Sequence, residues 1–542
     1  MIYEEKTKFN RFFAASAAIL LLMLYAPFCL NFQELFSDEG FYISAARELQ
    51  TFPPLMTAQG DVYFGGYPLY PFLVSLISRA GIPMEYALRL IPCVSFLVLA
   101  VVVFLSTWKA KSVLEGIIAA SVLMLNLISI DKFSDGNPVL LATLGIFSAW
   151  MIWFTLGVWQ GYWNLTWIIS FLLLGIVFYT IGISGVILTV FPMFFHRRPL
   201  TVWTKPRDGG FITGLMVLLF FLLLWGIPRW TAPGNVMWRG NEYYLPTIGE
   251  YLIHLATFPF DAAFRFLPWT LFAWAPFCPA IVPLDENPLL SRYLRTLFLG
   301  TFVLLWLSPF TESRDMFYMV PPLAVLVALN YWIVVRRYGW KLLRVFQILA
   351  VTVLILCTGL FSYLLIPQEI LPEILFSDLQ FLKDSPYWKL SLICSAAGAV
   401  FALSAILMCS LGSRVWLVIC ILSAAVIIPY RGVILPCRGL ESPRKKIGQE
   451  FRNALPGKEL PKVVYRMYDV PPSYCEMYYF GIQIKTISAA EELPENDSLV
   501  YVFSSVVPSA PERNWECLHK VFYKNRNIEL WCGELKTEED YE

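Results

Sequence analysis

The sequence predicts an all-α polytopic membrane protein with a small α/β soluble domain at its C-terminal end. Of 542 residues, 58% are hydrophobic and only 15% are charged, so the chain has more apolar surface than a soluble core can bury. Apolar stretches of about 17 to 25 residues, long enough to cross about 30 Å of hydrocarbon, recur along it. After Arg431 the composition turns polar. We therefore expect a membrane domain over 1–435 and an exported domain over 436–542.

The membrane domain is predicted to contain about thirteen transmembrane helices. The first follows Lys6, Lys8 and Arg11 and lacks a small-residue cleavage site, so it is expected to be a retained anchor rather than a removed signal. The predicted spans are 11–31, 86–107, 112–130, 137–157, 163–179, 181–195, 210–228, 266–284, 296–310, 315–335, 345–366, 389–410 and 414–431.

Basic loop residues predict the orientation, because Lys and Arg near span ends are retained on the cytoplasmic side. The segment 163–195 is either one long helix or two short ones. Two helices place the basic clusters at 197–207 and 336–344 on the same inner side, whereas one helix would separate them. We therefore expect two helices there, a cytoplasmic N-terminus and a periplasmic or extracellular C-terminal domain, with a bacterial inner membrane as the location.

Two long outer loops are expected to carry function. The first, over 32–85, is too long for a simple connection. Its apolar residues have helical spacing over 38–50, which predicts an interfacial amphipathic helix, and a second apolar helix is expected at 69–80. The second loop, over 229–265, is rich in aromatic residues, which form either an interface belt or a platform for a sugar or lipid.

The C-terminal domain is predicted from short runs of alternating hydrophobicity. Strands are expected at 463–467, 482–487, 499–503 and 528–531, with a helix near 473–480. The exported tail also contains four cysteines, an even number that permits disulfides without establishing any: Cys437, Cys475, Cys517 and Cys532.

Acidic residues stand where spans emerge on the outer face. Asp38 and Glu39 follow the first span, and Asp131, Lys132 and Asp135 form the short turn before the fourth. One interpretation is local, since acids stabilise the positive end of a helix and Asp135 also precedes a good helix start. The other is catalytic, because these acids share one face with recurring arginines, a pattern that suggests chemistry on a charged lipid-linked substrate.

Four arginines lie at or near the outer membrane boundaries: Arg229, Arg239, Arg265 and Arg314. A guanidinium group can hold phosphate oxygens with two parallel hydrogen bonds. For any single arginine, snorkelling to lipid headgroups is the alternative. We expect at least one of the four to bind phosphate.

Taken in order, these motifs resemble those of the lipid-phosphate-dependent GT-C glycosyltransferases, the group that contains aminoarabinose transferase and the protein O-mannosyltransferases. The resemblance covers about the first 335 residues and rests on the ordered set rather than on any one motif. The motifs are Asp38-Glu39, Tyr67-Pro68-Leu69-Tyr70, Asp135, Leu267-Pro268-Trp269, and Arg314 through Tyr318-Met319-Val320-Pro321-Pro322.

The resemblance implies roles for particular residues. Asp38 is expected to be the general base, while Asp135 or Glu39 assists it or orders the acceptor. Near the carrier phosphate, the resemblance implies Arg314 and Tyr318, with Arg239 or Arg265 as a second cation. The first outer loop is expected to contact substrate through Tyr63, Tyr67 and Tyr70.

One motif departs from the family pattern. Aminoarabinose transferases have a Glu-Lys pair before a Pro-Pro-Leu sequence, and here Gly65-Gly66-Tyr67 occupies that place. The departure argues against aminoarabinose as the sugar and leaves the general reaction unchanged.

The residue inventory fits a single-displacement, inverting sugar transfer without help from the family. A sugar on a polyprenyl phosphate already has a good leaving group, so one carboxylate that deprotonates the acceptor hydroxyl is sufficient. Arginines would stabilise the charge that accumulates on the departing phosphate. The expected partners are a polyprenyl-phosphate-linked sugar donor and a lipid, glycan or protein acceptor.

Other partners and cofactors have less support. The formal net charge of +1 gives no reason to expect nucleic acid. The three histidines are far apart and outside any zinc spacing, while the acids leave open a divalent cation such as Mg²⁺ or Mn²⁺. The rival interpretations are a transporter or flippase of lipid-linked sugars and an oligosaccharide ligase. A transporter should carry ionisable residues near the bilayer midplane, whereas the predicted span centres here are nearly free of charge.

Overall fold

The computed structural model describes residues 34–36, 38–49, 57–63, 67–197, 200, 209–231, 236–237, 246–366, 387–412, 414–437, 444–456, 460–470, 472–494, 497–523 and 526–536. The predicted first span at 11–31 lies outside these residues. The chain divides into two compact units. The helical unit comprises Met1–Phe32, Arg89–Gly226 and Tyr243–Arg438, and the mixed unit comprises Gln33–Leu88, Ile227–Glu242 and Gly439–Glu542.

The described residues contain eight helices that are long and apolar enough to cross a membrane, which identifies an integral membrane protein. Most of them coincide with predicted spans, and the predicted membrane-protein class is confirmed. They are α4 (Met84–Ala110), α7 with η2 (Val139–Ile152 and Trp153–Trp159), α8 (Trp163–Ile181), α10 (Gly209–Thr231), α13 (Pro288–Leu307), η7 with α14 (Ser313–Met319 and Val320–Leu365), α17 (Trp388–Ser410), and α18 with η10 (Val415–Pro429 and Tyr430–Ile434).

Shorter helices complete the helical unit. The predicted span 112–130 is divided into α5 (Val113–Met124) and α6 (Leu127–Lys132). The division falls at Asn126, whose side-chain oxygen caps α6 by accepting the Ser129 backbone N–H at 2.8 Å. The other short elements are α9 (Ile183–Val190), η3 (Phe191–Phe195), α11 (Ile248–Arg265) and α19 (Leu435–Cys437).

The predicted span 266–284 is wrong. Prolines at positions 268, 276, 279 and 283 remove backbone donors and interrupt the helical ladder. The segment instead forms α12 (Thr270–Ala273), η5 (Ala275–Phe277) and η6 (Val282–Leu284), none of which is long enough to cross a bilayer. The separation of 315–335 from 345–366 is also wrong, because α14 runs through both as one helix of 46 residues.

The predicted break within 163–195 is confirmed, although the second helical segment, Ile183–Phe195, is shorter than the helices identified as long enough to cross a membrane. Helix α8 ends at Gly182, which has φ 76° and ψ −148°, and α9 begins at the next residue. This backbone conformation is accessible almost only to glycine. The glycine therefore fixes the break between α8 and α9, which pack against each other.

Replacing Gly182 with alanine is expected to destabilise the protein by about 1–3 kcal/mol, because the new Cβ is strained at this φ and ψ. The measurement is the thermal unfolding midpoint of the purified protein. Gly359→Ala is the matched control, since Gly359 lies within α14 and a Cβ there would meet no atom within 4 Å. An unchanged midpoint for Gly182→Ala would contradict the proposed backbone constraint.

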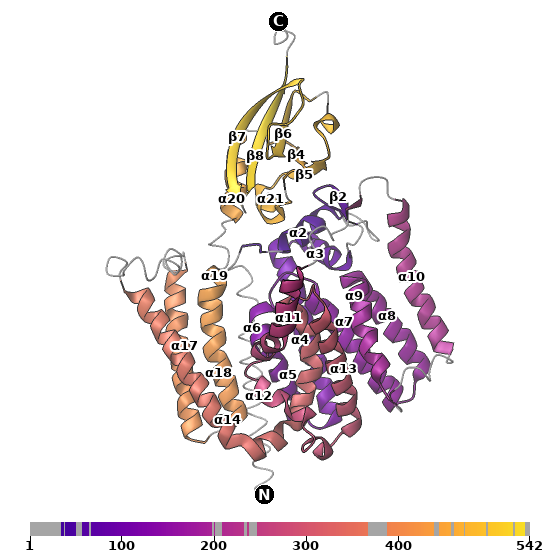
Figure 1. The fold of residues 1–542 in the computed structure, drawn as a ribbon, viewed down its shortest axis with the longest axis vertical. Coiled ribbons are helices and arrows are strands. Elements are labelled where there is room, and N and C mark those ends of the chain that lie inside the picture. Colours follow the sequence, from indigo (N-terminus) through magenta and orange to yellow (C-terminus); the bar gives the residue numbers. More distant parts are fainter. Residues whose placement is uncertain are drawn as a thin grey trace. The chain divides into compact units, whose positions relative to one another are not determined.

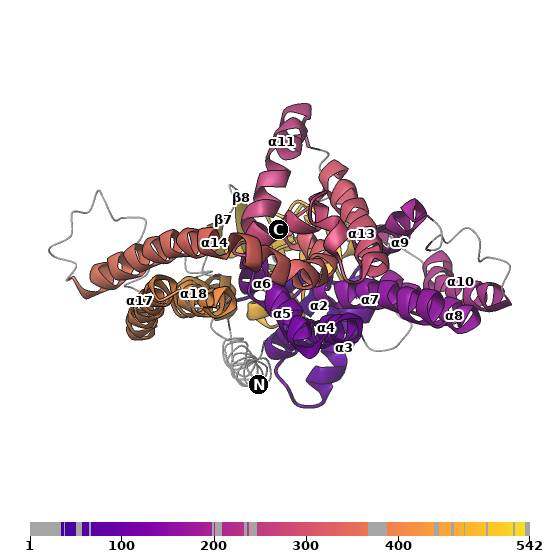
Figure 2. The ribbon, with the colours of Figure 1, turned by 90° about the horizontal axis from the view of Figure 1, so that it is seen from below.

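Two groups of helices lie on either side of α4, α5 and α13 in the helical unit (Figures 1 and 2). Helices α14, α17 and α18 lie side by side, and α7, α8 and α9 form the other group. Helix α10 packs on α8, where Gly175 leaves room for the ring of Phe221. Close approach at small residues is the usual way in which membrane helices pack.

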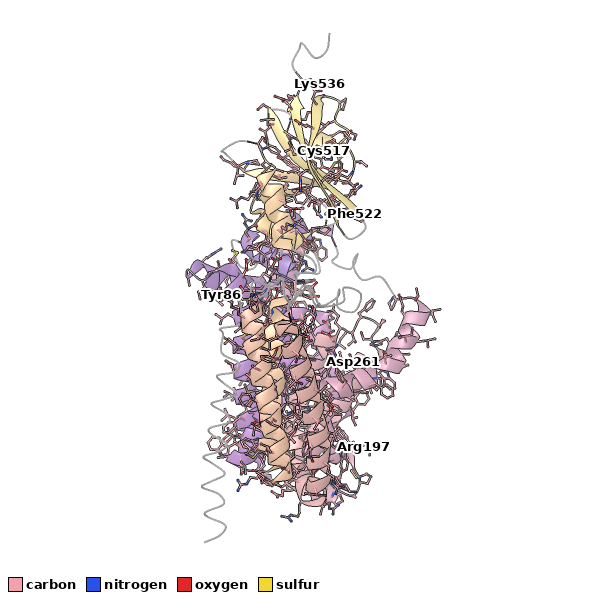
Figure 3. All side chains as sticks on the ribbon, turned by 90° about the vertical axis from the view of Figure 1, so that its left-hand side faces the viewer. Tyr86, Arg197, Asp261, Cys517, Phe522 and Lys536 are labelled. Carbon is pink, nitrogen blue, oxygen red and sulfur yellow. The ribbon has the colours of Figure 1, made fainter. Side chains whose placement is uncertain are left out.

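The mixed unit contains a five-stranded sheet with the order β5-β4-β6-β8-β7. Strand β4 (Val463–Met467) pairs in parallel with β5 (Gln483–Ile487) and β6 (Leu499–Ser504), and β8 (Arg526–Leu535) is antiparallel to β6 and β7. Helices α20 (Arg444–Asn453) and α21 (Tyr474–Phe480) complete this domain. The predicted strands and helix are confirmed, whereas β7 (Arg513–Tyr523) was not predicted. Figure 3 labels Cys517 and Phe522 on this strand.

The first outer loop packs with the C-terminal domain in the mixed unit. Helix α2 (Glu39–Glu48) and α3 (Leu69–Arg79) form where the sequence predicts them, and α2 packs on α21. The approach is close, since a Cβ at Gly40 would lie 2.5 Å from the Cys475 backbone nitrogen. Strands β1 (Thr57–Ala58), β2 (Asp61–Tyr63) and β3 (Val236–Met237) form a second, small sheet. The soluble part of the unit is thus assembled from three separate segments of the chain.

Candidate active site

A cluster of charged side chains gathers at the C-terminal end of α6 in the helical unit. Lys132 Nζ lies 3.6 Å from Asp131 Oδ2 and 3.2 Å from Asp135 Oδ2. Arg265 Nη1 lies 3.8 Å from the same oxygen of Asp131. The Lys132 and Asp135 side chains are 17% and 15% exposed, so the groups are sheltered and still reachable. We call Asp131, Lys132, Asp135, Asp261 and Arg265 the ion cluster.

Helix α11 contributes the last two members of the ion cluster. Arg265 Nε donates to both carboxylate oxygens of Asp261, at 2.9 and 3.0 Å, across one helical turn. Figure 3 labels Asp261 on this helix. The i,i+4 spacing holds the guanidinium group at the end of α11, where it also faces Asp131. The cluster thus joins α6 and α11, which are more than one hundred residues apart in the chain.

The end of α18 adds two residues to the edge of the cluster. The Tyr430 hydroxyl donates a hydrogen bond to Asp131 Oδ1. Arg431 is 6% exposed, and its guanidinium carbon lies 4.2 Å from the centroid of the Phe133 ring. Both residues belong to the π-helical turn η10, which reorients side chains relative to the preceding α-helix.

The short helix η7, which carries Arg314 and Tyr318, packs against α6 and α7. Phe96 links the two regions, since its ring centroid lies 6.0 Å from that of Phe133 and 6.2 Å from that of Phe317. Arg314 Nη2 pairs with Glu312 Oε2 at 2.7 Å, and Tyr318 is buried. The structure therefore places the predicted phosphate ligands on an element that lies next to the ion cluster.

Asp38 and Glu39 belong to the mixed unit, at the start of α2. Asp38 is the residue before the helix and its side chain makes no capping hydrogen bond, while it keeps partial exposure. Glu39 is 4% exposed, and its Oε2 accepts the Phe36 backbone N–H at 3.0 Å. The two acids therefore differ in setting: Glu39 stabilises the chain entering α2, and Asp38 is the more accessible carboxylate. Ser37, a residue type that often caps the start of a helix, lies outside the described residues.

Two of the three predicted substrate tyrosines of the first loop, Tyr63 and Tyr70, have packing roles in the mixed unit. The Tyr70 hydroxyl donates to the Leu88 carbonyl oxygen at 2.6 Å, and its ring meets Tyr42 edge-on. Tyr63 is buried, shares a hydrogen bond with the Tyr474 hydroxyl and packs against Phe41. Tyr67 is half-buried. Of the three, Tyr67 keeps the most side-chain surface for a substrate.

A second group of ion pairs in the helical unit lies on loops that the sequence assigns to the opposite side. Lys111 Nζ lies 3.2 Å from Glu286 Oε1, and Arg295 Nη2 lies 3.0 Å from Asp285 Oδ2. Burial raises the pKa of Asp285, and the positive charge of Arg295 opposes that rise. The Lys111–Glu286 pair connects the start of α5 to the segment before α13, and the Asp285–Arg295 pair holds that segment against α13.

Metal ligands and two predicted arginines complete the inventory. Among the residues that the structure describes, no three His, Cys, Asp or Glu side chains are grouped in a way that could hold a metal ion. Arg239 lies outside the described residues. Arg229 is buried near the end of α10.

Sequence reasoning did not identify Asp261, Tyr430 or Arg431. The spacing of Asp261 and Arg265 offered a signal, because i,i+4 acid–base pairs on a helix commonly interact. In the sequence, Tyr430 and Arg431 stand at the end of the last predicted span, and nothing there indicated a role in the site. Their contact with α6 joins residues 299 positions apart, which periodicity alone does not reveal.

Comparison with known proteins shows likeness in three dimensions only: no family model and no curated protein matches the sequence. ArnT from Cupriavidus metallidurans in the apo state matches with a TM-score of 0.69 and 14% identity, over 97% of this chain and 98% of that chain. The same protein bound to undecaprenyl phosphate gives a TM-score of 0.67 and 14% identity, over 96% and 98%. An oligosaccharyltransferase from Archaeoglobus fulgidus gives 0.42 and 12%, over 87% of this chain and 61% of that chain. Because the likeness to ArnT extends over nearly the whole of both chains, this protein has the GT-C fold.

Proposed function

We propose that this protein is a membrane glycosyltransferase that moves a sugar from a polyprenyl-phosphate carrier to an acceptor hydroxyl on the exoplasmic side of the membrane. The observation that carries the proposal is the ion cluster, which gathers three carboxylates and two cations in a partly exposed part of the helical unit. The fold supports it, because ArnT, which shares that fold, has been solved with undecaprenyl phosphate bound.

The cations are proposed to hold the carrier phosphate. Lys132 and Arg265 already face carboxylates, and a phosphate would compete for the same N–H donors. Arg314 Nη2 faces Glu312 at 2.7 Å, and a phosphate would compete with that carboxylate for the N–H bonds of the guanidinium group. Several cations around one phosphate stabilise the negative charge that develops as the sugar leaves. No acid is then needed to protonate the leaving group.

Asp38 is proposed to remove the proton from the acceptor hydroxyl. It is partly exposed, whereas Glu39 is buried. A carboxylate within hydrogen-bond reach of the attacking hydroxyl can act as general base in a single displacement, which inverts the anomeric carbon. Asp135 is proposed to orient Lys132, its partner at 3.2 Å, rather than to contact the acceptor.

The hydrocarbon part of the carrier needs an apolar surface. The helical unit contains an apolar cavity of about 220 Å³ lined by Trp153, Trp167, Phe171 and Phe211. Apolar, aromatic-lined cavities are typical binding sites for hydrocarbon groups. We propose this cavity as a place for part of the isoprenoid chain.

Arg314→Gln is expected to weaken the binding of undecaprenyl phosphate by about 10- to 100-fold, because charge-assisted hydrogen bonds contribute about 1.5–3 kcal/mol each. The measurement is native mass spectrometry or a fluorescent-lipid competition assay on the full-length protein in nanodiscs. Arg337→Gln, at an exposed position of α14, is the control and should bind as the unchanged protein does. Equal binding by both variants would remove Arg314 from the phosphate site.

A further inference from the structure

The mixed unit contains a polar cavity that the proposed transfer reaction does not use. Its volume is about 360 Å³, within the range of small-molecule sites. The walls come from α2, the β1–β2 hairpin, α21 and β5. The polar lining residues that matter here are Arg47, Glu48, Thr57, Gln59, Tyr478 and Gln483.

The buried side-chain amide of Gln59 is the main evidence that the cavity binds a ligand. Its side chain is 3% exposed, and neither amide atom has a hydrogen-bond partner among the residues that the structure describes. A buried amide without partners loses its hydration and gains nothing in return. Since Gln59 lines the cavity, a ligand there can supply both a donor and an acceptor to this amide.

The backbone holds Gln59 in a conformation that its residue type does not favour. Gln59 and Gly60 have φ of 54° and 77°, and they form the two-residue turn between Ala58 and Asp61. Such turns prefer Asn, Asp or Gly at the first position. The Gln59 carbonyl oxygen accepts the Thr486 backbone N–H and the Thr486 hydroxyl, both at 3.1 Å, so β5 fixes the turn. The longer amide side chain is thus fixed at the cavity despite an unfavourable backbone.

The charges around the cavity balance. Arg47 and Glu48 are neighbours of opposite sign; Arg47 Nη2 donates to the Gly481 carbonyl oxygen at 3.0 Å, and Glu48 Oε2 accepts the Gly60 N–H at 3.3 Å. Burial, with Glu85 nearby, raises the pKa of Tyr478 to about 12, so its hydroxyl stays protonated at neutral pH. Among the described lining residues, Arg47 and Glu48 contribute one charge of each sign, a lining that does not favour a phosphate or a free carboxylate.

The lining groups match a ligand that is rich in hydroxyls. The side-chain amides of Gln59 and Gln483 and the hydroxyls of Ser44 and Thr57 can each donate and accept hydrogen bonds. A sugar hydroxyl also donates and accepts hydrogen bonds, so these groups suit it. Apolar side chains in the same wall, with the Tyr478 ring, suit the C–H face of a pyranose. A peptide could instead bind by pairing as an extra strand with the edge of β5. This is disfavoured, because the Thr486 backbone N–H on that edge already donates its hydrogen bond to the Gln59 carbonyl oxygen.

We propose that this cavity is a binding site for a neutral saccharide, recognised through the Gln59 amide. The inference stands on the cavity and its lining, and it does not depend on the proposed transfer reaction.

The test is saturation-transfer NMR on the full-length protein in a detergent without a sugar headgroup. The probes are the methyl β-glycosides of glucose, galactose and N-acetylglucosamine. At least one probe should bind, and Gln59→Leu should weaken that binding at least 10-fold. Gln59→Asn, which keeps an amide and suits the positive φ, should retain measurable binding. Gln160→Leu makes the same chemical change at an exposed position of the helical unit and should change nothing.

A stability measurement separates recognition from structure. Because Gln59→Leu removes a buried amide without partners among the described residues, the ligand-free variant should unfold at the same temperature as the unchanged protein or higher. If that variant fails to fold, Gln483→Leu, at an exposed position of β5, should weaken the binding instead. The proposal is overturned if no glycoside binds, if binding survives the leucine variants, or if only a neutral tripeptide amide binds in a Gln59-dependent way.

Discussion

Asp38→Asn is expected to lower the rate of sugar transfer by about 100- to 10,000-fold, the range that a general base typically contributes. Asparagine keeps the size of the side chain and removes its ability to accept the hydroxyl proton. The binding of undecaprenyl phosphate should be unchanged, because Asp38 is proposed to act on the acceptor hydroxyl and not on the carrier phosphate. The measurement is release of undecaprenyl phosphate from a sugar-charged donor, with membranes from a strain that lacks the native protein.

Two further variants make the Asp38 result specific. Asp38→Glu keeps the carboxylate one bond further from the backbone and should recover part of the activity. Glu491→Gln, an exposed carboxylate of the same unit, should have no effect. Full activity in a folded Asp38→Asn protein would remove Asp38 as the base.

Lys132→Met is expected to lower transfer by about 100- to 1,000-fold, as the loss of one stabilising donor at a developing charge commonly does. Lys132 lies between Asp131 and Asp135, so its loss leaves two neighbouring carboxylates that repel an incoming phosphate. Both the turnover number and the KM for the donor should worsen. Steady-state kinetics with the polyprenyl-phosphate sugar measures both.

The controls for Lys132 test charge and position separately. Lys132→Arg keeps the positive charge and should recover most of the donor binding. Lys389→Met removes an exposed lysine at the start of α17 and should leave the kinetics unchanged. Unaltered donor kinetics in Lys132→Met would show that the ion cluster only holds α6 and α11 together.

Much of the fold follows from hydropathy and local period. Helices α8, α17 and α18 were predictable because each is a continuous apolar run between polar residues. Strands β4 and β6 follow from short β-prone runs, and α2 from its helical spacing. The segment 266–284 was wrongly predicted to be a transmembrane span because its composition is apolar, whereas its prolines prevent a long helix.

The missed features depend on contacts between distant parts of the chain. Strand β7 (Arg513–Tyr523) mixes polar and apolar residues, and its position is set by pairing with β8. The packing of α2 on α21 required knowledge of which segments meet. The bond from Tyr430 to Asp131 depends on the π-helical turn at the end of α18, which no local pattern announces. The sequence could thus identify the acids and arginines as candidate site residues, whereas the residues that contact them in the structure could not be predicted.

The central claim is that a sugar is transferred from a polyprenyl phosphate, and reconstitution tests it most directly. The full-length protein in proteoliposomes would receive undecaprenyl-phosphate sugar with a radiolabelled sugar and an extract of membrane lipids and glycans as acceptors. We expect the label to appear in a new product in step with free undecaprenyl phosphate, and both to disappear in Asp38→Asn. Movement of intact donor to the opposite leaflet, with no cleavage of the sugar–phosphate bond, would contradict the account and identify a transporter.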